Sequence, residues 1–294
     1  MQAAAPTPQG GERRLFASGL ALIAISASAF GAMAIFARFA YAGGADALGA
    51  LIARFTIAGA FLTALMVAKR RAWPRGRALA VAVAMGAVGY VGQAVCYFSA
   101  LNYASAGLVA LLLYAYPTLV CILAALLQHE RLSRARVALL MVSFVGIALT
   151  LGGGNGTPTG IALALGAAAF YSVYIIVGAR ELGRTDALAS ATVVCLSAAA
   201  TLVFAALLRA PHFPQVWWGW GALVAIALVS TVVAILTFFA GLKRVGPAVA
   251  SIASTLEPVV TVALAWWILG ETLSSTQIVG GALVLGAAGW LARR

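Results

Sequence analysis

The sequence predicts an all-α integral membrane protein whose ten transmembrane helices form two inverted-topology five-helix repeats. Three observations support this fold class. Of the 294 residues, 64% are hydrophobic and only 9% are charged, whereas a soluble domain is about a quarter charged. The chain contains ten apolar runs long enough to span a bilayer. One long segment also occurs twice in related form, which indicates an internal duplication.

The ten apolar runs are interpreted as helices, because a backbone surrounded by lipid must satisfy its polar groups within its own segment. The strands of a barrel would be shorter and would alternate in polarity. Residues 1–14 are polar and are predicted to form a cytoplasmic tail. The predicted spans are 15–41, 47–68, 78–100, 104–128, 134–151, 160–179, 187–208, 218–241, 247–269 and 275–292.

The repeat is clearest in residues 238–274, which align without a gap on residues 97–133, 141 positions earlier. Pro117 falls on Pro258 and Glu130 on Glu271, while Asp46 and Asp186 begin the second and seventh spans. Because each half has an odd number of helices, the second half enters the membrane in the opposite sense. The predicted units are residues 15–151, an external linker at 152–159, and residues 160–294.

The distribution of positive charge predicts that both termini are cytoplasmic. In that orientation sixteen of the nineteen Lys and Arg residues lie on the cytoplasmic side, and only Arg209 lies outside. The net charge of +12 therefore reflects membrane orientation, and we expect no nucleic-acid partner. The expected partners are the lipid bilayer and a small-molecule substrate. No ATPase subunit is indicated, and we expect a monomer in a bacterial inner (plasma) membrane.

Each half carries a proline, an apolar run and a closing acidic motif. In the second half these are Pro258 and the run Leu269-Gly270-Glu271-Thr272-Leu273. The first half departs from it, with Gln128-His129-Glu130 where Leu-Gly-Glu is usual. The pattern resembles the drug/metabolite transporter superfamily of the EamA type over nearly the whole chain. Within that family the chain resembles the bacterial exporters of aromatic amino acids. The resemblance implies a secondary transporter that exports small amphiphilic metabolites, in particular aromatic or neutral amino acids, by alternating access.

Polar residues within the apolar spans are candidate cavity residues, because each costs free energy unless it meets a partner or water. On the third span the candidates are spaced i, i+3, i+7 and share one face. A shift of 141 carries that stripe to the eighth span, and the sixth and fourth spans add further tyrosines. The stripes suit either a pocket for an aromatic substrate with a polar end or an interhelical hydrogen-bond seam. The residues are Tyr90, Gln93, Tyr97, Thr231, Phe238, Tyr171, Tyr174, Tyr114 and Tyr116.

The ninth span carries Ser254 and Glu257 on one face, with Glu257 near the midplane. Glu257 is either a cavity group for a substrate ammonium or a proton, or a structural group beside a broken turn. Pro117 and Pro258 predict kinks, which are either hinges around the cavity or static bends. Arg54 lies about 10 Å from the outer end of its helix. It is either an anchor for a substrate carboxylate or paired with Asp46 or helix-end carbonyls.

Catalytic and metal-binding patterns are absent from the sequence, so we expect no enzyme activity and no cofactor. His129 and His212 fall on opposite sides of the membrane and cannot share a metal. Arg38, close to the outer end of the first span, is expected to extend to the interface. Two alternative functions remain. One is a multidrug or cation exporter of the same superfamily, although no acidic residue lies in the first span. The other is a non-transporting receptor or scaffold, which the polar stripes disfavour.

Overall fold

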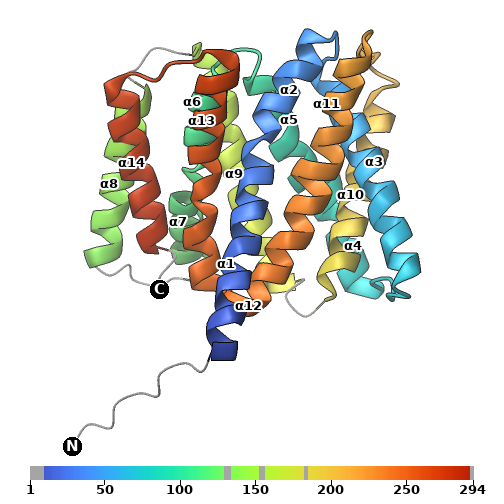
Figure 1. The fold of residues 1–294 in the computed structure, drawn as a ribbon, viewed down its shortest axis with the longest axis horizontal. Helices are drawn as coiled ribbons and strands as arrows, with labels where there is room; N and C mark the ends of the chain where they lie inside the picture. The colour runs from blue at the N-terminus through green and yellow to red at the C-terminus, as the bar shows by residue number, and fades with distance from the viewer. Residues whose placement is uncertain (1–9, 129–133, 152–155, 182–184, 292–294) are drawn as a thin grey trace, which may run out of the picture.

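The computed structural model describes residues 10–128, 134–151, 156–181 and 185–291, and in them the chain is helical (Figure 1). The first half contains α1 (Gly10–Gly31), α2 (Met33–Ala42), α3 (Ala47–Ala68), α4 (Gly76–Ala84), the π-helical segment η1 (Met85–Tyr90), α5 (Val91–Ala100), α6 (Ala106–Leu113), α7 (Tyr116–Gln128) and α8 (Arg134–Leu151). The second half contains α9 (Pro158–Glu181), α10 (Ala187–Ala205), α11 (Trp217–Ala227), the π-helical segment η2 (Leu228–Val233), α12 (Ala234–Ser254), α13 (Leu256–Leu269) and α14 (Ser275–Leu291).

These helices form the ten predicted spans, and the predicted all-α membrane fold is confirmed. Several spans consist of more than one helix: α1 with α2, α4 with η1 and α5, and α6 with α7. The helix α12 bends at Gly246, where φ is +78°, so its two parts belong to the eighth and ninth spans. Within the described residues, eight helices are long and apolar enough to cross a membrane, and Val137–Thr150 and Ser275–Ala287 are shorter apolar helices.

The two halves run through the molecule in opposite directions. α1 begins at the face where α14 ends (Figure 1). α9, which begins the second half, starts at the opposite face, where the N–H of Thr157 donates to the carbonyl of Tyr103 at 3.0 Å. Equivalent caps mark the repeat: Asp46 accepts from the N–H of Gly49 at 2.7 Å, and Asp186 from that of Ala189 at 3.0 Å. The carboxylates stabilise equivalent helix N-termini in both halves.

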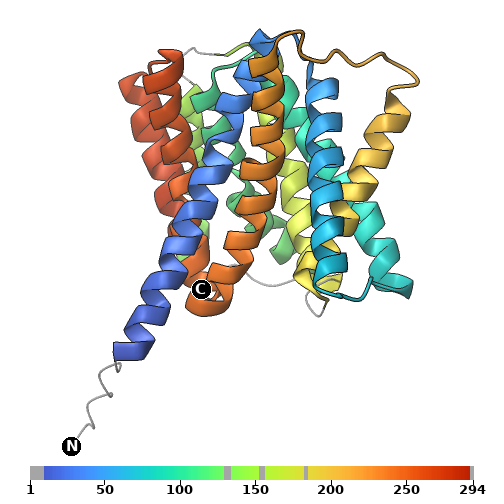
Figure 2. The same ribbon diagram turned by 45° about the vertical axis from the view of Figure 1, so that its right-hand side comes forward.

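The packing of the helices repeats the symmetry of the sequence. Figure 2 shows α1 (blue) running beside α12 (orange). α1 packs on α12 and α13 of the other half, and its counterpart α9 packs on α5, α6 and α7. The equivalent helices α3 and α10 pack on each other, as do α8 and α14 at one edge of the bundle. Small residues permit close approach: a Cβ on Gly280 of α14 would lie 2.5 Å from the carbonyl oxygen of Gly146.

The chain breaks its helices at equivalent places in the two halves. α6 ends at Leu113 and α12 at Ser254, 141 positions later, and Pro117 and Pro258 lie in the first turn of the helix that follows. Both predicted kinks are present. A proline in the first turn of a helix removes no hydrogen bond of that helix. Each interruption therefore lies just before the proline, and a new helix begins there.

The sequence did not predict the interruptions in the other spans. The first span breaks at Ala32, next to the carbonyl of Gly31, which accepts from the Thr261 hydroxyl at 2.8 Å. The segments η1 and η2 fall within the third and eighth spans. The helix α1 begins at Gly10 and α9 at Pro158, inside the ranges predicted as the tail and linker. Residues 1–9 and 152–155 of those two units lie outside the described part of the chain.

Candidate functional site

Arg54 is buried in α3, where its side chain joins the two halves. It is 2% exposed. Its Nε donates to Thr231 Oγ1 in η2 at 2.9 Å, and its Nη2 donates to the Tyr90 hydroxyl in η1 at 2.8 Å. Tyr90 and Thr231 are the residues that the 141-residue shift relates to each other. Neither partner foreseen for Arg54, Asp46 or a helix-end carbonyl, is the one observed.

Aromatic rings surround the guanidinium of Arg54. Its Cζ lies 4.9 Å from the ring centroid of Phe55, 5.3 Å from that of Tyr90 and 5.6 Å from that of Phe98. At these distances the ring quadrupoles attract a cation. None of the ion pairs among the described residues includes Arg54. Its charge is therefore balanced by hydroxyl groups and rings rather than by a carboxylate.

A row of tyrosines leads away from Arg54 through contacts between their rings. Tyr90 contacts Tyr174 at 5.6 Å between centroids, Tyr174 contacts Tyr171 at 6.2 Å, and Tyr171 contacts Tyr116 at 4.7 Å. Tyr116 then contacts Tyr114 at 5.5 Å. These spacings are those of favourable aromatic pairs. The row links η1, α9 and the break between α6 and α7, and four of its five tyrosines are half-buried.

The far end of the tyrosine row meets Glu257, where the two broken helices lie against each other. The Tyr114 hydroxyl lies 2.6 Å from the carbonyl oxygen of Ser254 and 3.1 Å from Glu257 Oε2. The break in the ninth span leaves the Ser254 carbonyl available, and the tyrosine satisfies it. Because Tyr114 has one proton and two acceptors beside it, the Glu257 carboxyl does not have a full hydrogen bond of its own.

The structure brings together most of the residues that the sequence singled out, but two remain apart. Tyr90, Tyr171, Tyr174, Thr231, Arg54, Ser254 and Glu257 belong to one connected set. Gln93 is half-buried and Tyr97 is buried, its ring 6.0 Å from that of Phe98. The ring of Phe238 contacts Phe239 at 5.7 Å. Tyr97 thus joins the set through Phe98, whose ring faces the Arg54 guanidinium, whereas no hydrogen bond or ring contact among the described residues joins Gln93 or Phe238 to it.

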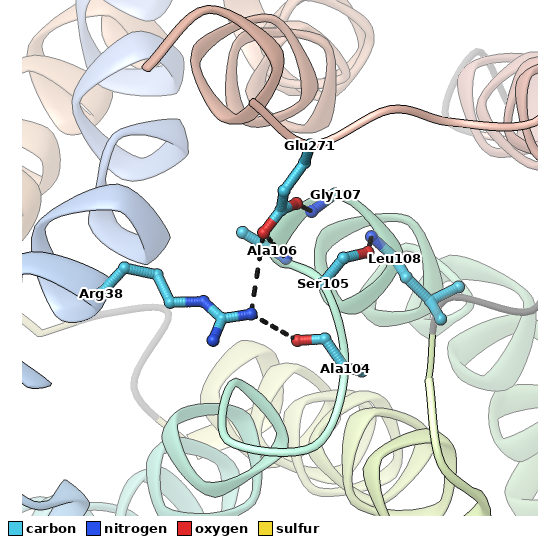
Figure 3. A network of polar contacts seen from close by, with 7 residues as sticks. All are labelled: Arg38, Ala104, Ser105, Ala106, Gly107, Leu108 and Glu271. Atoms are coloured by element: carbon cyan, nitrogen blue, oxygen red, sulfur yellow. Dashed lines mark hydrogen bonds and ion pairs between the residues drawn. The ribbon is translucent and has the colours of Figure 1, made fainter. Parts of the chain in front are cut away.

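A second polar network, which sequence reasoning missed, caps α6 from the opposite half (Figure 3). Glu271 accepts from the backbone N–H groups of Ala106 at 2.9 Å and Gly107 at 3.1 Å. Arg38 lies 3.6 Å from the same carboxylate and donates to the Ala104 carbonyl at 2.8 Å. Arg38 therefore bonds to protein groups instead of extending to the interface. The sequence feature that could have revealed this network is the alignment of Glu271 with Glu130 in the repeat. Glu130 itself lies outside the described residues.

The opposite face of the bundle carries two ion pairs between the halves. Arg77 contacts Glu181 through two hydrogen bonds of 2.8 Å, and Arg71 lies 3.3 Å from Asp186. The hydrogen bonds from Arg77 lower the pKa of Glu181 below its usual value. These contacts place the connections that follow α3 and α9 on one face of the molecule. Arginine clusters on this face, as the predicted cytoplasmic side requires.

Comparison with known proteins agrees with this architecture. The family described as the EamA-like transporter family matches residues 17–152 and again residues 158–293. A solved crystal structure with 24% sequence identity superposes with a TM-score of 0.61 and covers 96% of each chain. At that identity the likeness shows the fold alone.

Curated relatives have low identity over most of their length. The chain is 29% identical over 250 residues to the aromatic amino acid exporter YddG of Ancylobacter novellus, which covers 80% of this chain and 83% of the relative. It is 24% identical over 278 residues to the uncharacterized transporter YcbK of Bacillus subtilis, covering 90% and 89%. The uncharacterized transporter YyaM of the same organism is 23% identical over 213 residues, covering 69% and 70%.

Proposed function

Because the chain belongs to the EamA-like transporter family, we propose that it is a secondary transporter that exports small amphiphilic metabolites, in particular aromatic or neutral amino acids. Transport proceeds by alternating access, and the protein lies in a bacterial inner membrane with both termini cytoplasmic. The relative named as an aromatic amino acid exporter supports this substrate class. The inverted repeat supports the mechanism, since two halves of opposite orientation can expose one site to either side.

One observation carries the proposal: a row of half-buried tyrosines runs between Arg54 and Glu257, in contact with helices of both halves. Aromatic faces bind an apolar or aromatic body, and a charged group at one end of the row orients its polar part. The proposed cavity residues are Tyr90, Gln93, Tyr97, Tyr171, Tyr174, Thr231, Phe238, Ser254 and Glu257. Gln93 and Tyr97 would join the cavity as residues of the span that holds Tyr90, and Phe238 as a residue of the span that holds Thr231.

Pro117 and Pro258 mark the proposed hinges. Each follows a break at an equivalent point of its half, and the two breaks contact each other through Tyr114 and Ser254. A change at one break is thus transmitted directly to the other. Movement of both broken helices together would close one side of the cavity while opening the other.

Counterflow in proteoliposomes tests the proposal. Vesicles containing the full chain and loaded with unlabelled phenylalanine or threonine should accumulate the labelled amino acid well above protein-free vesicles. Tyr171→Ala should reduce this accumulation at least about fivefold, because a stacking platform contributes about 1 kcal/mol. Tyr171→Phe retains the ring and serves as the matched control. Absence of counterflow for every amino acid tested would eliminate the amino-acid assignment.

Export of organic cations is a second candidate because Glu257 is a half-buried carboxyl group with an incomplete set of hydrogen bonds. A carboxylate in this position attracts a cationic substrate or carries a coupling proton. Glu257→Gln separates these possibilities from a structural role. If amino-acid counterflow by this variant is unchanged from pH 6 to 8 and no cation competes, Glu257 has neither function.

A further inference from the structure

Arg54 is a buried charge that the packing of its helix does not explain. The caps at Asp46 and Asp186 set the register of α3 against α10, and in that register Arg54 corresponds to Val194, 140 positions later. Val194 is 2% exposed, as Arg54 is. The two helices pack on each other across the pseudo-twofold axis. A small apolar residue therefore fills the equivalent position in the same architecture, so packing alone does not explain a buried arginine.

The hydrogen bonds around Arg54 also have a defined direction, which leaves donors in excess. The Thr231 hydroxyl gives its proton to the Ile226 carbonyl at 2.9 Å, so it can only accept from Arg54. The Tyr90 hydroxyl accepts from Nη2, and no hydrogen bond in the described part of the chain uses its proton. Nη1 likewise makes no hydrogen bond there. Nη1 and the Tyr90 O–H are thus neighbouring donors with no described acceptor.

We propose that this pair of donors binds the carboxylate of the transported substrate, so that the transporter selects organic anions and zwitterions and rejects simple amines. The inference rests on the proposed function, because it assigns the substrate class of the same site. A guanidinium provides parallel N–H groups that match a carboxylate, and such pairs are strongest where water is excluded. Arg54 then begins the tyrosine row, along which the body of the substrate extends.

The arrangement also links binding to both halves. The carboxylate would engage an arginine held by Tyr90 of the first half and Thr231 of the second. The donors proposed for the carboxylate, Nη1 and the Tyr90 O–H, are separate from the Nε that holds Thr231 of the other half. Recognition of the anion and the contact between the halves thus meet at one guanidinium.

Direct binding to the full chain in lipid nanodiscs, measured by calorimetry, tests the inference without depending on transport. The probes are phenylalanine, 3-phenylpropionate, phenylalaninamide and 2-phenylethylamine, of which only the first two carry a carboxylate. We expect those two to bind at least about tenfold more tightly than the others. Equal binding of phenylalanine and its amide by the wild-type protein would overturn the inference, whatever the variants do.

Arg54→Gln should remove the preference, weakening the two carboxylates at least about tenfold and leaving the amine and the amide within twofold. Arg209→Gln, the same replacement at an exposed arginine, is the matched control and should change nothing. If Arg54→Gln does not fold, Arg54→Lys keeps the charge without the paired donors and should reduce the preference severalfold. A folded Arg54 variant that still prefers carboxylates refutes the assignment. Counterflow of simple amines at the same rate as of amino acids would refute it while leaving the transporter proposal intact.

Discussion

Replacing Glu271 with alanine should destabilise the fold by about 3–5 kcal/mol, because it removes the cap of a buried helix. The first three N–H groups of α6 have no partner within the helix. Glu271 accepts from two of them, Ala106 and Gly107, and the Ser105 hydroxyl accepts from the third, Leu108, at 3.3 Å. Each hydrogen bond to a charged acceptor contributes about 1.5–3 kcal/mol. The Glu271 side chain is 17% exposed, so water replaces little of this interaction.

The ion pair with Arg38 should contribute much less than the cap. Its atoms are 3.6 Å apart and the Arg38 side chain is 31% exposed, which places the pair near the range of about 0–1 kcal/mol for exposed pairs. Arg38→Met also loses the hydrogen bond to Ala104, so about 1–2 kcal/mol is expected in total. Ser105→Ala should cost about 1 kcal/mol, the usual value for an N-cap.

The order of stability of the three variants can be measured by equilibrium unfolding. Each variant is titrated with a denaturing detergent, and unfolding is followed by tryptophan fluorescence. Glu271→Ala should be the least stable, followed by Arg38→Met and Ser105→Ala. Glu271→Gln, which keeps one acceptor oxygen, should fall between alanine and wild type. The reasoning fails if Arg38→Met costs as much as Glu271→Ala, because the ion pair and not the cap would then dominate.

Three further predictions concern packing, the breaks and pH. Gly280→Ala should strongly destabilise the protein, because its Cβ would lie 2.5 Å from the Gly146 carbonyl oxygen. Gly286→Ala, whose Cβ would have no atom within 4 Å, should leave the stability unchanged. Equal melting temperatures of the two variants would contradict this prediction. The Pro258→Ala variant should fold, but its rate of counterflow should fall severalfold, because the new N–H of Ala at position 258 can compete with Tyr114 for the Ser254 carbonyl. An unchanged rate would exclude a hinge at this position. The pKa of Glu181 is lowered in the folded protein. Its pairing with Arg77 therefore stabilises the folded state at pH values above the unfolded pKa of about 4.3, and this stabilisation is lost as the pH falls below that value. The free energy of unfolding of the wild type should therefore exceed that of Glu181→Gln by a constant amount near neutral pH, and the difference should shrink below about pH 4. A difference that grows below about pH 4 would contradict the lowered pKa of Glu181.

The sequence predicted the features that depend on local pattern. The helix starts at Asp46 and Asp186, the kinks at Pro117 and Pro258 and the ten helical spans all follow from residue type and spacing. The partners of Arg54 and Arg38 did not follow, because they come from segments far apart in the chain. Arg54 bonds to a residue 177 positions away, and Glu271 caps a helix 165 positions earlier. Only the fold determines which of many polar groups meets a buried charge.

Residues that stabilise the fold are shared by the two halves, whereas residues of the proposed site differ between them. The caps, the breaks and the π-helical segments occur in both halves, so these shared features build the scaffold. The groups of the proposed site occur where the halves differ: Arg54 corresponds to Val194, Tyr90 to Thr231, and Tyr116 to Glu257. A site on the axis of a symmetric pair would carry the same charge at both ends. Since one end here has a guanidinium and the other a carboxyl, the proposed site is asymmetric, and a carboxylate at Arg54 with the apolar body along the tyrosine row would give the substrate one orientation.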